Sequence, residues 1–177
     1  MSLLRPYVPV FKFVAAFGVI YVALSLMYYY YLQQDYSALN YPDPITSQVS
    51  YQTQQILLVL GYDARISNVP GNPSVYMFLN KQIVYRVIEG CNAVSVMILF
   101  VAFVLAFAKA WKKTILFITI GLLFIYLVNI LRLAGLAVIK LNYPQYDYIS
   151  HDIIFPAVIY GSVIALWLLW IKKPKTA

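Results

Sequence analysis

The sequence is poor in the residue types on which most catalytic and metal sites depend. Its 177 residues include one cysteine, one histidine and six acidic residues, and charged residues make up 11% of the chain. A single cysteine excludes an intrachain disulfide and a cysteine-rich metal site, and a single histidine excludes a histidine-cluster metal centre. We therefore expect no metal and no other cofactor, and any chemistry must depend on very few groups.

Hydrophobic residues are abundant instead, at 63% of the chain. This fraction is far above that of soluble domains and is typical of an integral membrane protein. The formal net charge of +7 could indicate nucleic-acid binding. However, most of the basic residues flank apolar runs, so orientation in a lipid bilayer explains them better.

The first apolar run extends from about Phe13 to Leu32 and is long enough to cross a hydrocarbon core of about 30 Å. The tyrosines at positions 28–31 suit the headgroup region, where an aromatic ring and its hydroxyl both find a favourable environment. A cleaved signal peptide is the alternative, but the run is long and lacks a small-x-small cleavage site. We therefore predict an uncleaved transmembrane helix over residues 13–32.

A polar excursion follows over residues 33–90, rich in Pro, Gln, Asn and Ser. Within it, apolar residues at helical spacing predict a helix from Ser47 to Leu60 that ends at Gly61. The tract at 64–89 alternates and carries β-branched and aromatic residues around two turn signals. It predicts a small β-hairpin or meander that leads directly into Cys91.

Three further apolar runs, at about 92–108, 114–139 and 153–171, can each span a membrane, the first only marginally. We therefore predict an α-helical integral membrane protein in which residues 1–177 form a single membrane domain. It has about four transmembrane helices, with a small α+β extracytoplasmic excursion between the first and the second.

Basic residues predict the orientation of these spans. Alternating spans place eight basic residues and no acidic residue on one side, which the positive-inside rule identifies as the cytoplasm. Both termini are expected there, and all six acidic residues fall on the opposite side or at its boundary. The eight basic residues are Arg5, Lys12, Lys109, Lys112, Lys113, Lys172, Lys173 and Lys175.

This topology brings three unusual residues to one depth near the outer face. Cys91 begins the second span and His151 directly precedes the fourth, both at the outer end. Arg132 lies roughly 27 Å along the third span from its cytoplasmic start, at 1.5 Å per residue. The only cysteine, the only histidine and the only arginine of the spans are therefore expected to converge.

Each of these three residues has a simpler explanation. A membrane cysteine is usually a small apolar filler, a histidine at a helix start is often exposed or part of a cap, and an arginine near the interface can snorkel. However, Cys91 follows Gly90 and heads a helix whose positive dipole end favours the thiolate. His151 is the only side chain expected to titrate near neutral pH, and Arg132 shares a helix face with Asn129.

Together these residues predict thiol acyl transfer. The thiolate would attack a carbonyl, the imidazole would protonate the leaving amine, and the guanidinium would balance the developing charge. Asn92 and Asn129 are candidate supporting residues. Three acidic residues could each orient His151, namely Glu89, Asp147 and Asp152, and Arg86 either assists at the mouth of the site or is a surface charge.

At these positions the sequence resembles the exosortase/archaeosortase family of membrane-embedded cysteine transpeptidases, and in particular its compact F-type exosortases. The resemblance extends over about 47–170 and includes a helix that closes on Leu-Gly, followed by a β-like tract. Its motifs are Glu89-Gly90-Cys91-Asn92-Ala93, Asn129-Ile130-Leu131-Arg132 and His151.

The resemblance implies a cysteine protease or transpeptidase that recognises the C-terminal sorting signal of membrane-anchored proteins. Cys91 would be the nucleophile, Arg132 the thiolate or oxyanion partner, and His151 the acid and base. It also implies a bacterial-type inner membrane with the site on the extracytoplasmic face, and transfer of the acyl group to an envelope acceptor.

Two other functions are compatible with the residues alone. A non-enzymatic assembly factor could bind partner helices and would tolerate loss of Cys91. A thiol acyltransferase could use Cys91 on a lipid thioester. The substrate motif, the acceptor and the oligomeric state stay open at the level of the sequence.

Overall fold

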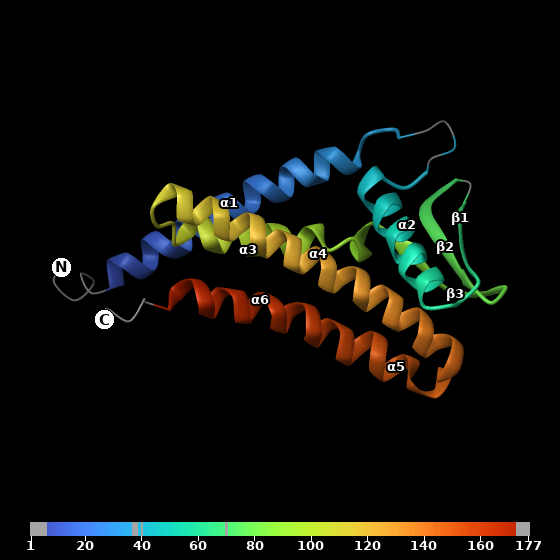
Figure 1. Cartoon of the computed structure of the whole chain (residues 1–177). Coiled ribbons are helices and arrows are strands. Elements are labelled where there is room, and N and C mark those ends of the chain that lie inside the picture. Colours follow the sequence, from blue (N-terminus) through green and yellow to red (C-terminus); the bar gives the residue numbers. More distant parts are fainter. Residues whose placement is uncertain (1–6, 37–38, 40, 70, 173–177) are drawn as a thin grey trace.

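The computed structural model describes residues 7–36, 39, 41–69 and 71–172. Figure 1 shows helices that run side by side, with a further helix and a small sheet at one end. Arg5, Lys173 and Lys175, whose charges helped to predict the orientation, lie outside the described residues, as do positions 37, 38, 40 and 70 of the excursion. The main elements are α1 (Val8–Leu32), α2 (Pro44–Val59), β1 (Ala64–Val69), β2 (Asn72–Leu79), β3 (Gln82–Ile88), α3 (Val94–Ala106), α4 (Trp111–Asn142), α5 (Asp147–Ile149) and α6 (Phe155–Ile171).

Among the described residues, three helical stretches are long and apolar enough to cross a membrane: Val8–Leu32, Trp111–Asn142 and Pro144–Ile171. α3 is apolar but has only 13 residues, roughly 20 Å at 1.5 Å per residue. It is shorter than the span predicted over 92–108, because Asn92 and Ala93 are not helical and Ala93 has a φ of +64°. α4 (Trp111–Asn142), in contrast, is longer than the span predicted over 114–139.

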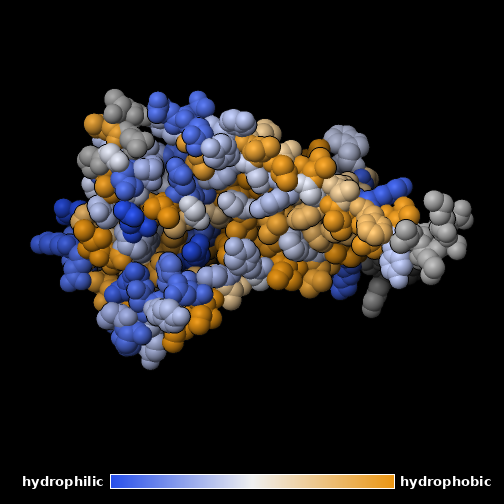
Figure 2. All heavy atoms as spheres, turned by 180° about the vertical axis from the view of Figure 1, so that it is seen from behind, coloured by the Kyte–Doolittle hydropathy of each residue, from blue (hydrophilic) through white to orange (hydrophobic). Residues whose placement is uncertain are grey.

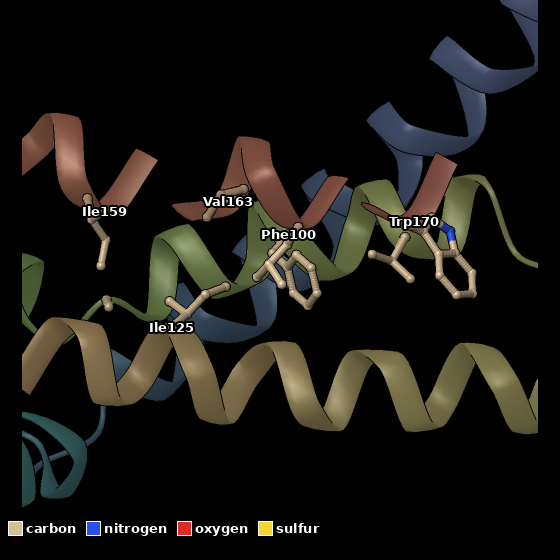
Figure 3. Packing of buried hydrophobic residues seen from close by; sticks show 8 residues of the cluster. Phe100, Ile125, Ile159, Val163 and Trp170 are labelled. Carbon is tan, nitrogen blue, oxygen red and sulfur yellow. The ribbon is translucent and has the colours of Figure 1, made fainter. Parts of the chain in front are cut away.

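The helices pack through a core of large apolar side chains. Phe100 of α3, Ile125 of α4 and Val163 of α6 are almost completely buried and meet in one cluster (Figure 3). Gly121 of α4 makes room for Phe100, since a Cβ at this position would lie 2.2 Å from the Cζ of that ring. The outer surface of these helices is largely apolar, as lipid contact requires (Figure 2).

α1 lies at the edge of this bundle, and no residue of α1 is buried in the described part of the chain. It packs on α3 through aromatic rings. Phe13 lies 4.2 Å from Phe107 and 5.6 Å from Phe103, measured between ring centroids. α1 is therefore positioned by α3 and by hydrogen bonds of Tyr28 and Tyr31 at its C-terminal end.

α2 begins three residues earlier than the predicted start at Ser47. The carboxylate of Asp43 caps the helix by accepting hydrogen bonds from the backbone N–H groups of Ile45 and Thr46. Pro44 occupies the first helical position, where a missing N–H costs nothing. The pair Asp43-Pro44 was a start signal in the sequence. The predicted end is confirmed, because Gly61 follows the helix with a φ of +89°.

In the described part of the chain, β1, β2 and β3 form an antiparallel sheet in the order β1-β2-β3, which confirms the predicted meander. The turn between β2 and β3 consists of Asn80 and Lys81, both with positive φ, as a two-residue hairpin turn requires. A second core joins this sheet and α2 to the C-terminal half of α4, and it includes Leu57, Met77 and Ala134.

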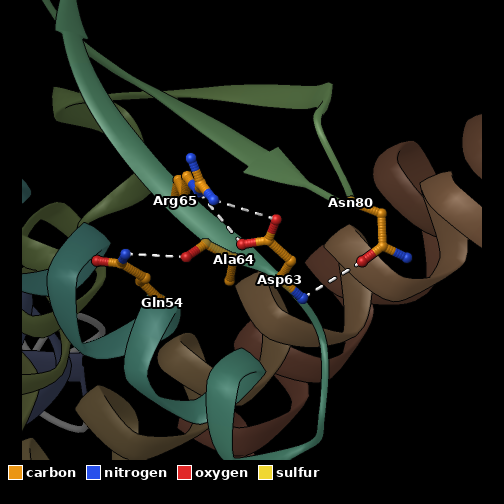
Figure 4. A network of polar contacts seen from close by, with 5 residues as sticks. All are labelled: Gln54, Asp63, Ala64, Arg65 and Asn80. Atoms are coloured by element: carbon orange, nitrogen blue, oxygen red, sulfur yellow. Dashed lines mark hydrogen bonds and ion pairs between the residues drawn. The ribbon is translucent and has the colours of Figure 1, made fainter.

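Polar contacts connect α2, β1 and the β2–β3 turn (Figure 4). Gln54 donates a hydrogen bond from Nε2 to the carbonyl of Ala64 at 3.0 Å. The backbone N–H of Asp63 donates to Oδ1 of Asn80 at 3.3 Å, and Asp63 also pairs with Arg65 at 3.2 Å. The first two of these contacts hold the start of the sheet against α2 and the β2–β3 turn.

The last helical segment begins at Pro144 rather than near Ser150. A 3-10 turn, α5 and a π-helical turn over Ser150–Ile154 lead into α6. The prediction that His151 directly precedes the last helix is therefore wrong, because Ser150, His151 and Asp152 all lie within helical structure. His151 lies in the π-helical turn, a type of irregularity that often accompanies functional sites.

The two ends of the molecule differ in charge. In Figure 1 the start of α1, the α3–α4 connection and the end of α6 lie together, opposite α2 and the sheet. Lys109 Nζ donates to the carbonyl of Trp170 at 2.5 Å, which joins two of these segments. The described basic residues of this end are Lys12, Lys109, Lys112, Lys113 and Lys172.

Candidate active site

Cys91, Arg132 and His151 border the same cavity, which has a volume of about 290 Å³. They come from the turn after β3, from α4 and from the π-helical turn before α6. The structure therefore brings together the three residues that the sequence placed at one depth. The other residues around the cavity are Tyr85, Arg86, Ile88, Leu133, Leu136 and Lys140.

Cys91 closes a 3-10 turn over Glu89–Cys91 and is partly exposed. The sequence predicted that Cys91 begins the helix that follows. In the structure Asn92 and Ala93 separate Cys91 from the start of α3. The helix dipole therefore acts on the thiol less directly than expected. A Cβ at Gly90 would meet no atom within 4 Å among the described residues, so this glycine is not required by crowding.

Asn92 holds the residues after Cys91 in place. Its Nδ2 donates to the Tyr28 hydroxyl at 2.8 Å and to Oγ1 of Thr46 at 3.0 Å, and its Oδ1 accepts from the N–H of Val94 at 3.0 Å. The side chain is 1% exposed. Asn92 thereby connects the turn to α1, α2 and the start of α3, and these bonds help to offset the left-handed backbone of Ala93.

The network continues to a buried carboxylate that no sequence motif indicated. Thr46 donates from Oγ1 to Oδ2 of Asp43 at 2.5 Å, and the Tyr31 hydroxyl donates to Oδ1 of Asp43 at 3.3 Å. Asp43 is 1% exposed, yet it accepts several hydrogen bonds, as a buried carboxylate requires. The tyrosines predicted to form an interfacial belt thus also bind the site's supporting network.

Arg132 is held by Asn129, the predicted supporting residue on the same helix face. Nη1 of Arg132 donates to Oδ1 of Asn129 at 3.3 Å, and Nδ2 of Asn129 donates to the carbonyl of Cys91 at 2.9 Å. Nε of Arg132 is buried and has no partner among the described residues. Arg132 also borders a second cavity of about 150 Å³ with Gly90, Pro156 and Tyr160. Arg132 thus borders both this second cavity and the one that Cys91 borders, with one donor left unused.

Tyr85 of β3 belongs to the site, although sequence reasoning did not select it. Its hydroxyl donates to the carbonyl of Leu133 at 2.8 Å. Burial raises the pKa of Tyr85 well above its usual value, the negative charge of a Cys91 thiolate raises it further, and Arg132 opposes the shift. Tyr85 therefore stays neutral. Its position in the predicted strand that leads to Cys91 was the feature of the sequence that could have indicated its place in the site.

The structure distinguishes the three acidic residues that could orient His151. Nδ1 of His151 lies 2.6 Å from Oδ1 of Asp152. Asp147 pairs instead with Lys140, at 3.1 Å. Glu89 has no contact with the imidazole among the described residues, and its pKa is raised by burial and then by Asp43. Asp152 is therefore the acidic residue placed to orient the ring.

The fold and this cavity define an α-helical membrane protein with a small sheet beside a cavity that holds its only cysteine. A family model described as transmembrane exosortase (Exosortase_EpsH) matches residues 9–169. The chain therefore belongs to the transmembrane exosortase family. Comparison with curated proteins and with solved structures gave no match.

Proposed function

We propose that this chain is a membrane-embedded cysteine protease and transpeptidase. It cleaves the C-terminal sorting signal of membrane-anchored substrate proteins at the outer face and transfers the acyl group to an envelope acceptor. One observation carries the proposal: Cys91, Arg132 and His151 border one cavity. Membership of the transmembrane exosortase family supports it.

The proposed reaction has two steps. The Cys91 thiolate attacks the scissile carbonyl, a carbon–sulfur bond forms, and Arg132 stabilises the negative charge on the oxygen. The carbon–nitrogen bond then breaks, and His151 gives its proton to the leaving amine. In the second step His151 takes a proton from the acceptor, which attacks the thioester and releases the thiolate. Water as the acceptor would give hydrolysis instead.

The same proposal includes an orientation and a count of spans. The end that carries Lys12, the α3–α4 lysines and Lys172 faces the cytoplasm, and the sheet and the cavity face the outside of a bacterial-type inner membrane. Four helices then cross or enter the bilayer, with α3 as the short one, and both termini are cytoplasmic. A substrate helix would lie in the bilayer beside α3, α4 and α6.

Substitution of each of the three residues by alanine tests the reaction. In host membranes, Cys91→Ala, Arg132→Ala and His151→Ala are expected to abolish C-terminal processing of membrane-anchored proteins, measured by mass spectrometry of their C-terminal peptides. Each variant should still insert into the membrane. Arg65→Ala, at an exposed arginine of β1, is the matched control and should process normally.

Normal processing by the Cys91→Ala variant would overturn the proposal. The mass of the intact enzyme during turnover adds a second test, because a peptide adduct on Cys91 differs from a fatty acyl adduct. A fatty adduct would indicate the thiol acyltransferase, and a Cys91 that no thiol reagent modifies would favour the assembly factor.

A further inference from the structure

β3 pairs with β2 along one edge only. The sheet order is β1-β2-β3, so β3 lies at the side of the sheet. No main-chain hydrogen bond joins its other edge to any segment of the described chain. An unpaired strand edge offers N–H and C=O groups to another extended chain.

The cavity that contains Cys91 runs along this free edge. Tyr85 and Arg86 are consecutive in β3, so their side chains lie on opposite faces of the sheet. Both nevertheless border the cavity. A cavity in contact with both must reach the edge of the strand, and β2 occupies the other edge. The free edge of β3 is therefore continuous with the cavity.

The register indicates which residues of β3 offer their main chain. Leu79 and Gln82 flank the two-residue turn and form its hydrogen-bonded pair. Hydrogen-bonded and non-hydrogen-bonded pairs then alternate along the two strands. At the register shift between Phe78 and Met77, β3 contains one extra residue. In this count the N–H and C=O groups of Arg86 and Ile88 point toward the free edge. Both residues border the cavity.

We propose that the substrate segment beside the scissile bond binds as an additional strand on the free edge of β3. This inference rests on the proposed function and adds the mode of substrate recognition. Cys91 follows Ile88 after two residues, so a peptide paired with Arg86 and Ile88 would present a carbonyl near the thiol. Main-chain pairing supplies affinity that does not depend on the substrate's side chains.

Peptide probes test the pairing in the full-length enzyme. The probe is acetyl-Ala-Ala-Ala chloromethyl ketone, in which the Cys91 thiolate displaces chloride and forms a carbon–sulfur bond. Because the chain has one cysteine, the intact mass reports this reaction directly. Two analogues carry an N-methyl group on the second or on the third alanine. Since only alternate residues of a strand face its neighbour, one analogue should react about tenfold more slowly and the other about as fast as the parent.

The outcomes separate the two proposals. Equal rates for the parent and both analogues, or equal slowing of both analogues, would overturn the strand pairing and leave the proposed function in place. A parent peptide that reacts no faster than chloroacetone, each relative to a free thiol, would instead contradict the proposed function together with the pairing.

A pair of proline variants provides a second test. Ile88→Pro removes an N–H that faces the free edge beside the cavity, whereas Ile83→Pro removes the equivalent N–H near the turn. The peptide probe should react about tenfold more slowly with Ile88→Pro and at the normal rate with Ile83→Pro. The peptide rate of each variant is divided by its own rate with iodoacetamide, so that a general change in the reactivity of the thiol cancels. Equal peptide rates in both variants would contradict the pairing.

Discussion

The side-chain amide of Asn129 donates a hydrogen bond of 2.9 Å to the backbone carbonyl of Cys91. The oxygen of the same amide accepts a hydrogen bond from Arg132 at 3.3 Å. Since a carbonyl only accepts and a guanidinium only donates, this orientation of the amide is the one that satisfies both partners. Asn129 therefore fixes the proposed nucleophile and the proposed oxyanion partner relative to each other.

Asn129→Asp tests this connection without changing the size of the side chain. A carboxylate has no N–H for the Cys91 carbonyl, and two acceptors would face each other in a buried place, at a cost of about 1–3 kcal/mol. We expect alkylation of Cys91 by the peptide probe to slow at least tenfold. Asn142→Asp at the exposed end of the same helix is the control. Equal rates in the two variants would show that the contact does not position the site.

Much of this site could be predicted from the sequence, because charge and hydropathy are local signals. The alternation of apolar runs and lysines predicted that Cys91, Arg132 and His151 would share one depth, and the structure places all three at one cavity. The predicted meander before Cys91 is also present. Depth along a membrane follows from counting residues, so these inferences did not need tertiary contacts.

The remaining features depend on contacts between distant segments. Asn92 and Tyr28 are separated by 64 positions, and no local pattern indicates that they form a hydrogen bond. That contact and the left-handed backbone of Ala93 explain why α3 begins after Cys91 rather than at it. The start of the last helix at Pro144 was missed for another reason, since its first turns are polar and carry no apolar period.

Asn92→Ala should destabilise the protein, because it removes three hydrogen bonds from a buried side chain and leaves Thr46 without a donor from the turn. We expect a loss of about 1–3 kcal/mol and a lower apparent Tm in detergent. Tyr28→Phe removes one of these bonds and should cause a smaller loss. An apparent Tm that is lower in Tyr28→Phe than in Asn92→Ala would contradict the central place of Asn92.

Glu89 gives the stability a pH dependence with a defined sign. Burial and then Asp43 raise its pKa above the ordinary value of 4.5. A carboxyl with a raised pKa contributes stability that is present below pH 4.5 and is lost as the pH rises through the folded-state pKa. Glu89→Gln should therefore raise the apparent Tm at neutral pH and flatten its dependence on pH above 4.5. Asp35→Asn, at an exposed position, is the control, and equal pH profiles for wild type and Glu89→Gln would refute the prediction.

Gly121 tests the packing of α3 on α4. A Cβ at this position would lie 2.2 Å from Cζ of Phe100, which is completely buried, so Gly121→Ala forces the ring or the helices apart. Overpacking of this kind costs about 1–3 kcal/mol. Gly161→Ala on α6 is the matched control, because its Cβ would meet no atom within 4 Å among the described residues. Apparent Tm values in detergent should fall only for Gly121→Ala, and equal values would contradict this packing.

Asp152→Asn tests how His151 is oriented. Nδ1 of the ring lies 2.6 Å from the Asp152 carboxylate, which in the proposed reaction would leave Nε2 to exchange protons and would stabilise the imidazolium. Both side chains are about half exposed, at 54% and 47%, so water screens part of this interaction. We therefore expect the rate of substrate processing to fall about tenfold rather than by the thousands seen at buried pairs. Asp147→Asn is the matched control, since Asp147 binds Lys140 instead, and it should change the rate less than twofold. Equal losses in the two variants would mean that the acidic residues act through the charge of the cavity and not through the ring.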